Sequence, residues 1–291
     1  MLFERILFKT LCTIGDRSIQ RPMKVPEAIE RCENLSYGPH GKWNLLDVFY
    51  PKGTDEKLPT IINIHGGGYV YGTKDVYKFY CMDLALRGFT VVNFSYRLAP
   101  KISFPEPVIE TNLVMKWVCK NAEKYFIDTD NIFFVGDSAG AQIASQYCAA
   151  VMNSEYAQLL GLEIPEFNIK AMGLNCGMYD NLDKHSPPLP GLMENYFGKD
   201  PARLGESIKV LKYVNSNYPP VFVMSARSDF LLPHAKPMYD FLTDKGIECQ
   251  LKIYGSPKQK NAGHVFHVNI LSPLAKECND DECKFFKKYV T

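Results

Sequence analysis

The pentapeptide Gly136-Asp137-Ser138-Ala139-Gly140, which follows the apolar run Ile132 to Val135, constrains the fold more than any other feature. Such a run is typical of a buried strand, and the residues from Ala139 to Cys148 have the apolar spacing of a helix. A serine at a sharp strand-to-helix turn has a strained backbone that lifts its hydroxyl above the sheet edge. The motif predicts that Ser138 is a nucleophile, although the pentapeptide alone fits an ordinary turn equally well.

Strand-length apolar runs alternate with helical patterns along most of the chain. Strands that are apolar throughout and separated by helices indicate a mostly parallel sheet covered on both faces, which is an α/β fold. Strands are expected at 45–50, 60–64, 89–94, 132–135, 171–176, 221–225 and 248–254, and helices at 76–87, 106–125, 233–245 and 274–289.

Composition and charge are those of an ordinary globular protein. The 291 residues are 46% hydrophobic and 22% charged, and the net charge of +1 gives no reason to expect nucleic acid or a membrane surface as a partner. The nine cysteines lack Cys-x-x-Cys spacing, so no metal site is expected, and a reducing compartment is favoured. We find no signal peptide and no run long enough for a membrane span. We therefore expect one cytoplasmic, soluble domain over residues 1–291.

Two stretches interrupt the α/β rhythm, one over about residues 1–41 and one over residues 177–218. Long interruptions within a compact domain are often lids or binding elements. We expect both to form a helical cap over the carboxyl edge of the sheet, with surface decoration as the alternative. Near the beginning of the first stretch, seven mostly apolar residues fall on one helix face: Leu2, Phe3, Ile6, Leu7, Thr10, Leu11 and Ile14.

A second motif, His65-Gly66-Gly67-Gly68, directly follows the expected strand 60–64. Consecutive glycines let backbone N–H groups turn into a cavity without steric cost. Such donors stabilise the oxyanion that forms when a nucleophile attacks an ester carbonyl. We expect the donors to be the amides of Gly66, Gly67 and Ala139, with His65 orienting the loop. The alternative is a flexible or phosphate-binding loop.

A serine nucleophile needs a base and an orienting carboxylate, which in α/β hydrolases follow it in the order acid, then histidine. Asp229 lies just past the strand 221–225 and is the expected acid. The expected base is His264, in the loop after the last strand, in preference to His267. His234 follows the acid too closely and is expected to begin a helix.

The chain resembles the hormone-sensitive-lipase-like branch of the α/β-hydrolase esterases. The matching segments are His65 to Gly68, Tyr96 to Pro100 with Phe104-Pro105, Gly136 to Gly140, Asp229 to Leu231 and His264 to Phe266. The resemblance implies Ser138 as nucleophile, Asp229 as acid, His264 as base, and a helical cap. It also implies that Leu274 to Thr291 can form a homodimer surface. Lys101, Glu106 and Val265 depart from the family pattern, which weakens any transfer of substrate preference.

These residues predict two-step acyl transfer on small, soluble esters with a short, acetyl-like acyl group, and no cofactor is expected. An amidase or deacetylase with the same triad is the first alternative, and a non-catalytic ligand receptor on this scaffold is the second. Aromatic and sulfur side chains are candidates for the substrate pocket, with cap core as their other interpretation: Tyr69, Tyr71, Met178, Tyr179 and Tyr196.

Overall fold

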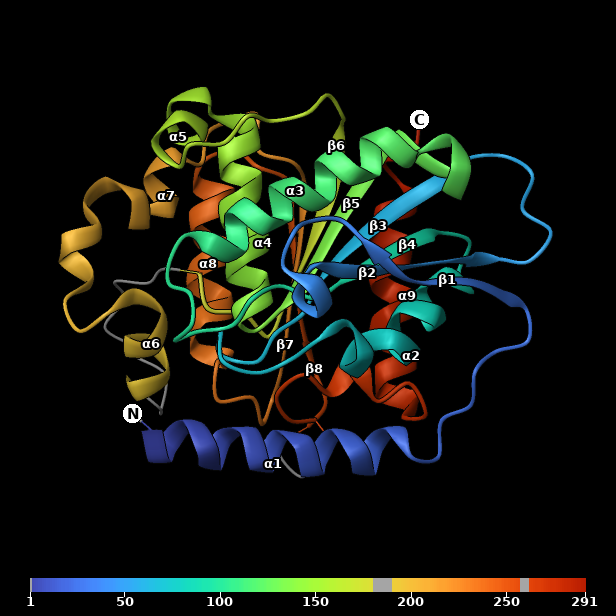
Figure 1. Cartoon of the computed structure of the whole chain (residues 1–291), viewed down its shortest axis with the longest axis horizontal. Helices are drawn as coiled ribbons and strands as arrows, with labels where there is room; N and C mark the ends of the chain where they lie inside the picture. Colours follow the sequence, from blue (N-terminus) through green and yellow to red (C-terminus); the bar gives the residue numbers. More distant parts are fainter. Residues whose placement is uncertain (1, 180–189, 257–261) are drawn as a thin grey trace.

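One eight-stranded sheet organises the chain (Figure 1). The computed structural model describes residues 2–179, 190–256 and 262–291. Strand order across the sheet is β1-β2-β4-β3-β5-β6-β7-β8. The first two pairings, β1 with β2 and β2 with β4, are antiparallel, and every later pairing is parallel. The predicted α/β fold with a mostly parallel sheet is therefore confirmed.

The elements follow the expected alternation. The strands are β1 Ile29–Ser36, β2 Leu45–Pro51, β3 Leu58–Ile64, β4 Thr90–Phe94, β5 Ile127–Asp137, β6 Ile169–Asn175, β7 Val221–Ala226 and β8 Cys249–Tyr254. The α-helices of the described residues are α1 Leu2–Gln20, α2 Lys74–Ala85, α3 Glu106–Asn121, α4 Ala139–Met152, α5 Ser154–Leu159, α6 Pro190–Phe197, α7 Val210–Tyr213, α8 Leu232–Asp244 and α9 Pro273–Lys287.

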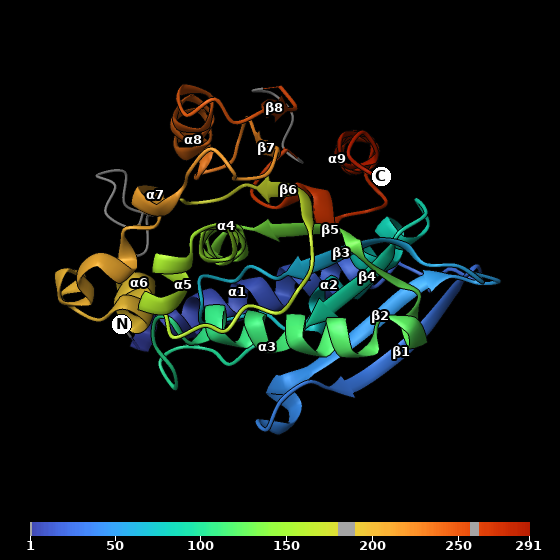
Figure 2. The same cartoon turned by 90° about the horizontal axis from the view of Figure 1, so that it is seen from above.

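Helices cover both faces of the sheet, as Figure 2 shows from above. Side chains of α3, α4 and α8 belong to one buried hydrophobic cluster, and those of α2 and α9 belong to the other. The central strands are buried on both faces, which is why they are apolar throughout; β4 has no residue that is even partly exposed. This rigid sheet holds in place the loops that leave its carboxyl edge.

The sequence did not predict β1, which lies inside the stretch expected to be cap. Only Ile29 of this strand is buried, and four of its eight residues are charged or amide side chains. β1 is an edge strand with one pairing partner, and its register with β2 is interrupted between Cys32 and Leu35. An exposed, irregular edge strand carries neither the continuous apolar run nor the strict alternation by which strands are found.

Helical elements of the two expected cap stretches lie together. Figure 1 shows α1 running along one side of the molecule, apart from the sheet, with α6 close to its beginning. The second stretch supplies α6, a 3₁₀ segment Pro201–Ile208 and α7, while residues 180–189 of that stretch lie outside the described residues. None of the helices that the structure describes has the length and apolar character that a bilayer span requires.

Candidate active site

Ser138 lies at the turn between β5 and α4, and its backbone is strained. Its φ is +53° and its ψ is −119°, outside the regions that non-glycine residues favour. A Cβ on Gly140 would lie 2.1 Å from the carbonyl oxygen of Ile64, and one on Gly136 would lie 2.4 Å from that of Gly140. The two glycines of the motif therefore allow the strand and the helix to pass closely enough to hold this turn.

Three side chains from different loops form a continuous hydrogen-bonded chain. Nε2 of His264 lies 3.0 Å from Oγ of Ser138, and Nδ1 of the same ring lies 2.8 Å from Oδ1 of Asp229. Because the carboxylate accepts a hydrogen bond from the Nδ1–H group, this arrangement leaves Nε2 free to accept the serine proton. The geometry is that of a nucleophile, a base and an orienting acid.

Asp229 is buried and held by two further donors. The hydroxyl of Ser225 donates to Oδ2 at 2.8 Å, and the backbone N–H of Leu231 donates to Oδ1 at 2.9 Å. Burial by itself raises the pKa of this carboxyl group, but the hydrogen bond and charge of His264 together with these two donors hold the pKa below its usual value. Asp229 is therefore an anion fixed in one orientation.

The glycine loop differs from the expectation at one amide. The N–H of Gly66 already donates to Oδ1 of Asp137 at 3.0 Å and to the Tyr77 hydroxyl oxygen at 3.1 Å, so it is not a free donor. The amides of Gly67 and Gly68 have no acceptor among the described residues, although both glycines line the same cavity as Ser138. The amide of Gly66 is therefore not available to an oxyanion, contrary to the expectation. Gly67 remains a candidate oxyanion donor, and Gly68 replaces Gly66 as the second one in this loop.

Ala139 is the third expected donor, and it opens helix α4. The first N–H groups of a helix have no partner within the helix. Ala139 lines the cavity beside Ser138, and no acceptor outside the helix is found for its amide among the described residues. The positive end of the helix dipole at this point also favours a developing negative charge.

Behind the glycine loop lies a buried polar network that holds its shape. Tyr77 donates to Oδ2 of Asp137 at 2.8 Å, and burial raises the pKa of Asp137 to about 6. The ring of His65 stacks on Tyr96 at 4.0 Å between centroids, and its Nδ1 lies 2.7 Å from the carbonyl oxygen of Gly66. Burial lowers the pKa of His65 to about 4, so the ring is neutral, and its contact with Gly66 is consistent with the role of orienting the loop.

A cavity of about 470 Å³ opens beside Ser138 and His264. Its walls come from the glycine loop, the loops after β5, β7 and β8, the helices α1 and α6, and Met178. Sequence reasoning missed several lining residues, half of which come from α1 and from the loop that carries the acid: Phe8, Leu11, Cys12, Asp16, Val76, Tyr77, Leu192, Met193, Phe230, Leu231, Val265 and Val268. Helical periodicity indicates which side chains share a face, but it does not indicate what that face covers.

Three of the five pocket candidates line this cavity, namely Tyr69, Tyr71 and Met178. The other two lie elsewhere in the described structure. Tyr196 is fully buried and stacks on the far side of Tyr69 at 4.1 Å between ring centroids, and the Tyr179 hydroxyl donates to the carbonyl oxygen of Leu174 at 3.1 Å. Tyr196 therefore supports the wall through Tyr69, and both side chains are buried core residues, in line with the second interpretation of these candidates.

His267 lies outside the hydrogen-bonded chain. Its ring is buried edge-on against Tyr80, 5.0 Å away between centroids, and neither ring nitrogen has a hydrogen-bond partner among the described residues. Burial lowers its pKa to about 3, so the ring stays neutral. Of these two histidines, it is His264 whose ring lies within hydrogen-bond distance of Ser138.

Within the part of the chain that the structure describes, one group of side chains has the composition of a metal site. Cys176, Asp229 and His264 each place a ligand atom within 4.8 Å of the others. Asp229 and His264 already bind each other, and burial raises the pKa of the Cys176 thiol well above its usual value. Because a metal needs the thiolate, this chemistry does not fit a metal site.

Known proteins resemble this chain in both sequence and fold. "Esterase LipQ" of Mycobacterium tuberculosis is 26% identical over 212 residues, which cover 70% of this chain and 50% of that protein. "Acetyl esterase" of Salmonella typhi is 26% identical over 257 residues, which cover 82% of this chain and 74% of that protein. The chain thus spans only about half the length of the first of these relatives.

Among solved structures, esterase B of Lactobacillus rhamnosis superposes with a TM-score of 0.91 at 22% identity, covering 99% of this chain and 95% of that one. This likeness shows the α/β-hydrolase fold. The sequence profile of the BD-FAE family matches residues 46–239, from β2 into α8. Because that match covers more than half of the chain and includes the glycine loop, the serine turn and Asp229, the chain belongs to the BD-FAE family of α/β-hydrolase-fold proteins.

Proposed function

We propose that this protein is a serine carboxylesterase that cleaves short-acyl esters of small molecules. The observation that carries the proposal is the chain from Ser138 through His264 to Asp229, which begins in a cavity that the unpaired amides of Gly67, Gly68 and Ala139 also line. Nucleophile, base, acid and oxyanion donors are the parts that acyl transfer requires.

In the first half-reaction, Oγ of Ser138 attacks the ester carbonyl carbon while Nε2 of His264 takes the hydroxyl proton. The negative charge that develops on the carbonyl oxygen is stabilised by the amides of Gly67, Gly68 and Ala139, each contributing about 3 kcal/mol. The tetrahedral intermediate collapses to an acyl-enzyme, and the leaving alcohol takes the proton from His264.

In the second half-reaction, water attacks the acyl carbon as His264 takes one of its protons. The new intermediate collapses, Ser138 leaves with the proton returned by His264, and the carboxylic acid is released. Asp229 keeps its charge throughout and stabilises the imidazolium that forms in each half-reaction.

The cavity supports the preference for short acyl groups. Its volume of about 470 Å³ lies in the lower part of the range for small-molecule sites and must hold both the acyl and the alcohol portions. Its lining is mainly apolar, with aromatic side chains such as Phe8, Tyr71 and Phe230. The name of the Salmonella relative, acetyl esterase, agrees with this size.

A hydrolysis profile across p-nitrophenyl esters of increasing acyl length tests the proposal. We expect the highest kcat/KM at acetate or butyrate and a steep decline at octanoate. A maximum at long chains would contradict the substrate assignment. A matched p-nitroanilide hydrolysed faster than its ester would instead favour the amidase.

The compartment and the assembly are part of the same proposal. All nine cysteines are free thiols, which supports a reducing compartment such as the cytoplasm. The implied dimer surface over Leu274 to Thr291 includes α9, which packs one side on the sheet and exposes lysines on the other. Sedimentation of the purified chain over a range of concentrations measures whether it dimerises.

A further inference from the structure

Helix α1 points its apolar face away from the protein. Its exposed residues include Phe3, which is 76% exposed, and Ile14, which is 62% exposed. No residue of α1 is buried. Six of the twelve large hydrophobic side chains that are strongly exposed in the described residues belong to this one helix: Leu2, Phe3, Ile6, Leu7, Leu11 and Ile14. They are six of the seven residues that the sequence placed on one helix face.

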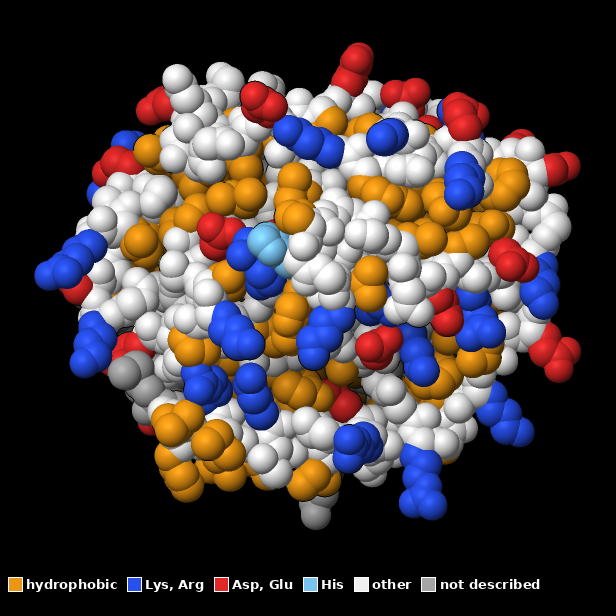
Figure 3. All heavy atoms as spheres, in the orientation of Figure 1, with side chains coloured by type: hydrophobic (Ala, Val, Ile, Leu, Met, Phe, Trp, Pro, Cys, Tyr) orange, Lys and Arg blue, Asp and Glu red, His pale blue; other side chains and the backbone are white. Residues whose placement is uncertain are grey.

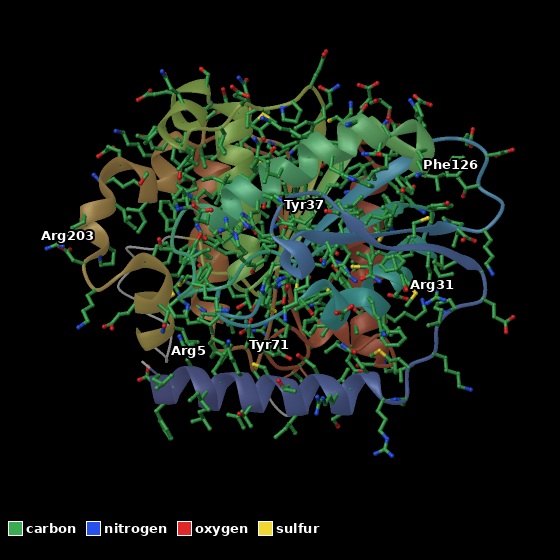
Figure 4. The ribbon with its side chains drawn as sticks, in the orientation of Figure 1. Arg5, Arg31, Tyr37, Tyr71, Phe126 and Arg203 are labelled. Carbon is green, nitrogen blue, oxygen red and sulfur yellow. The ribbon has the colours of Figure 1, made fainter. Side chains whose placement is uncertain are left out.

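The opposite face of α1 attaches to the protein through Phe8 and Ile19, which pack on the buried hydrophobic clusters, and through several polar groups. Tyr71 donates to Oδ2 of Asp16 at 2.7 Å, and the side-chain amide of Gln20 donates to the carbonyl oxygen of Val76 at 2.6 Å. Nη1 of Arg5 donates to Oδ1 of Asn195 at 3.4 Å. Figure 4 shows side chains along α1 that extend away from the rest of the molecule. This orientation is the reverse of that of an ordinary surface helix, whose apolar stripe packs on the core.

The apolar face of α1 continues into other exposed apolar side chains and into the mouth of the active-site cavity. Leu11 and Phe230 are both strongly exposed and both line that cavity. Leu271, also strongly exposed, lies in a surface depression that Ser18 and Ile19 of α1 help to line. Figure 3 shows hydrophobic side chains gathered at the margin where α1 begins, with Lys and Arg side chains nearby. Whatever covers this surface therefore lies next to the substrate entrance.

Charge distinguishes the region of α1 from the rest of the chain. Residues 1–24 contain five Lys and Arg (Arg5, Lys9, Arg17, Arg21 and Lys24) and two acidic residues (Glu4 and Asp16), a net charge of +3. Since the whole chain is +1, the remainder is −2. An exposed apolar helix face accompanied by basic residues is the pattern of helices that lie in the interface of an anionic membrane.

We propose that α1 docks on a lipid surface that carries negative charge, with its apolar face in the headgroup and acyl boundary and the cavity mouth facing the lipid. A second copy of the chain fits the helix less well. A helix of 19 residues is about 28 Å long, so a strip about 10 Å wide buries roughly 600 Å² over two copies. This area is about half of the roughly 1,200 Å² that stable interfaces need at least.

Flotation of the full chain with vesicles tests the proposal. One vesicle population is phosphatidylcholine mixed with phosphatidylglycerol, and the other is phosphatidylcholine alone. We expect the protein to float with the mixed vesicles and to bind the neutral vesicles much more weakly. Replacing two outward side chains in the variant Phe3→Glu/Ile14→Glu lowers binding to the mixed vesicles by about a hundredfold. The matched control is Leu159→Glu, which changes a 46% exposed leucine outside α1 and leaves binding unchanged.

Neither variant alters a residue that lines the cavity, so both should keep the thermal unfolding midpoint and the hydrolysis rate of a soluble ester. The proposal is overturned if the wild type does not float, if it floats equally with both vesicle types, or if the double variant floats as well as the wild type. Light scattering tests the alternative that a second copy of the chain covers this face. The alternative would hold if the wild type forms a dimer but does not bind vesicles, and if the double variant is a monomer while Leu159→Glu remains a dimer.

Discussion

The contacts of Asp229 predict an unusual result for its replacement by asparagine. In the serine protease triad this change lowers kcat by about 10⁴ because the amide holds the histidine in the wrong tautomer. Here, Oδ1 accepts both from Nδ1 of His264 and from the N–H of Leu231, whereas Oδ2 accepts from the hydroxyl of Ser225. A hydroxyl can rotate and accept a hydrogen bond, whereas a backbone N–H can only donate.

An asparagine at this position therefore keeps its oxygen at the Oδ1 site and turns its NH₂ group toward Ser225. The reverse orientation would leave the Leu231 N–H without an acceptor and set two donors against each other, at a cost of about 1–3 kcal/mol for each unsatisfied group. The productive tautomer of His264 is thus retained. What is lost is the negative charge beside the imidazolium, and we expect kcat/KM to fall about 10²-fold, or about 2.7 kcal/mol.

The comparison variant is Asp229→Ala, which removes the acceptor altogether and should lower kcat/KM by about 10⁴-fold. The assay is steady-state hydrolysis of p-nitrophenyl acetate by both variants and the wild type. Equal losses in the two variants would refute the argument that Leu231 and Ser225 fix the amide. The double variant Asp229→Asn/Ser225→Ala checks the mechanism, because it removes the acceptor for the NH₂ group and should lose more activity than Asp229→Asn alone.

Further predictions concern the histidines and a glycine. Ester hydrolysis should fall by about 10⁴-fold in His264→Ala and by less than about tenfold in His267→Ala, and equal losses would contradict the assignment of the base. The buried His267, with its pKa lowered to about 3, binds no proton in the native state between about pH 3 and pH 6.5, whereas the unfolded state does. Stability is therefore lost as the pH falls through this window. Between pH 7 and pH 4.5, the free energy of unfolding measured in urea should fall by about 2 kcal/mol less in His267→Phe than in the wild type. Gly140→Ala, whose Cβ would meet the Ile64 carbonyl oxygen, should destabilise the fold by about 1–3 kcal/mol, and an unchanged thermal midpoint would show that the turn has room.

The sequence predicted those parts of the molecule whose signal is local. The central strands are apolar throughout because they are buried on both faces, and the serine turn is recognisable because only glycine fits where Gly140 meets Ile64. The positions of Asp229 and His264 were predictable because each follows a strand of the sheet whose carboxyl edge carries the site.

Features that depend on tertiary contacts were not predictable in the same way. The amide of Gly66 is engaged because Asp137, 71 residues away, accepts from it. Nothing in the sequence around Tyr196 indicates whether this side chain lines the cavity or packs behind a residue that does. β1 could not be recognised because it is a polar and irregular edge strand. Periodicity reveals the apolar face of α1, but it does not show that this face points toward solvent.

The central claim is that Ser138 is the nucleophile, and covalent labelling tests it most directly. A fluorophosphonate reacts with an activated serine and leaves an adduct that intact-mass and peptide measurements can locate. We predict one adduct per chain, on the peptide that contains Ser138, and none in Ser138→Ala. An unlabelled wild type, or equal labelling of Ser138→Ala, would contradict the account.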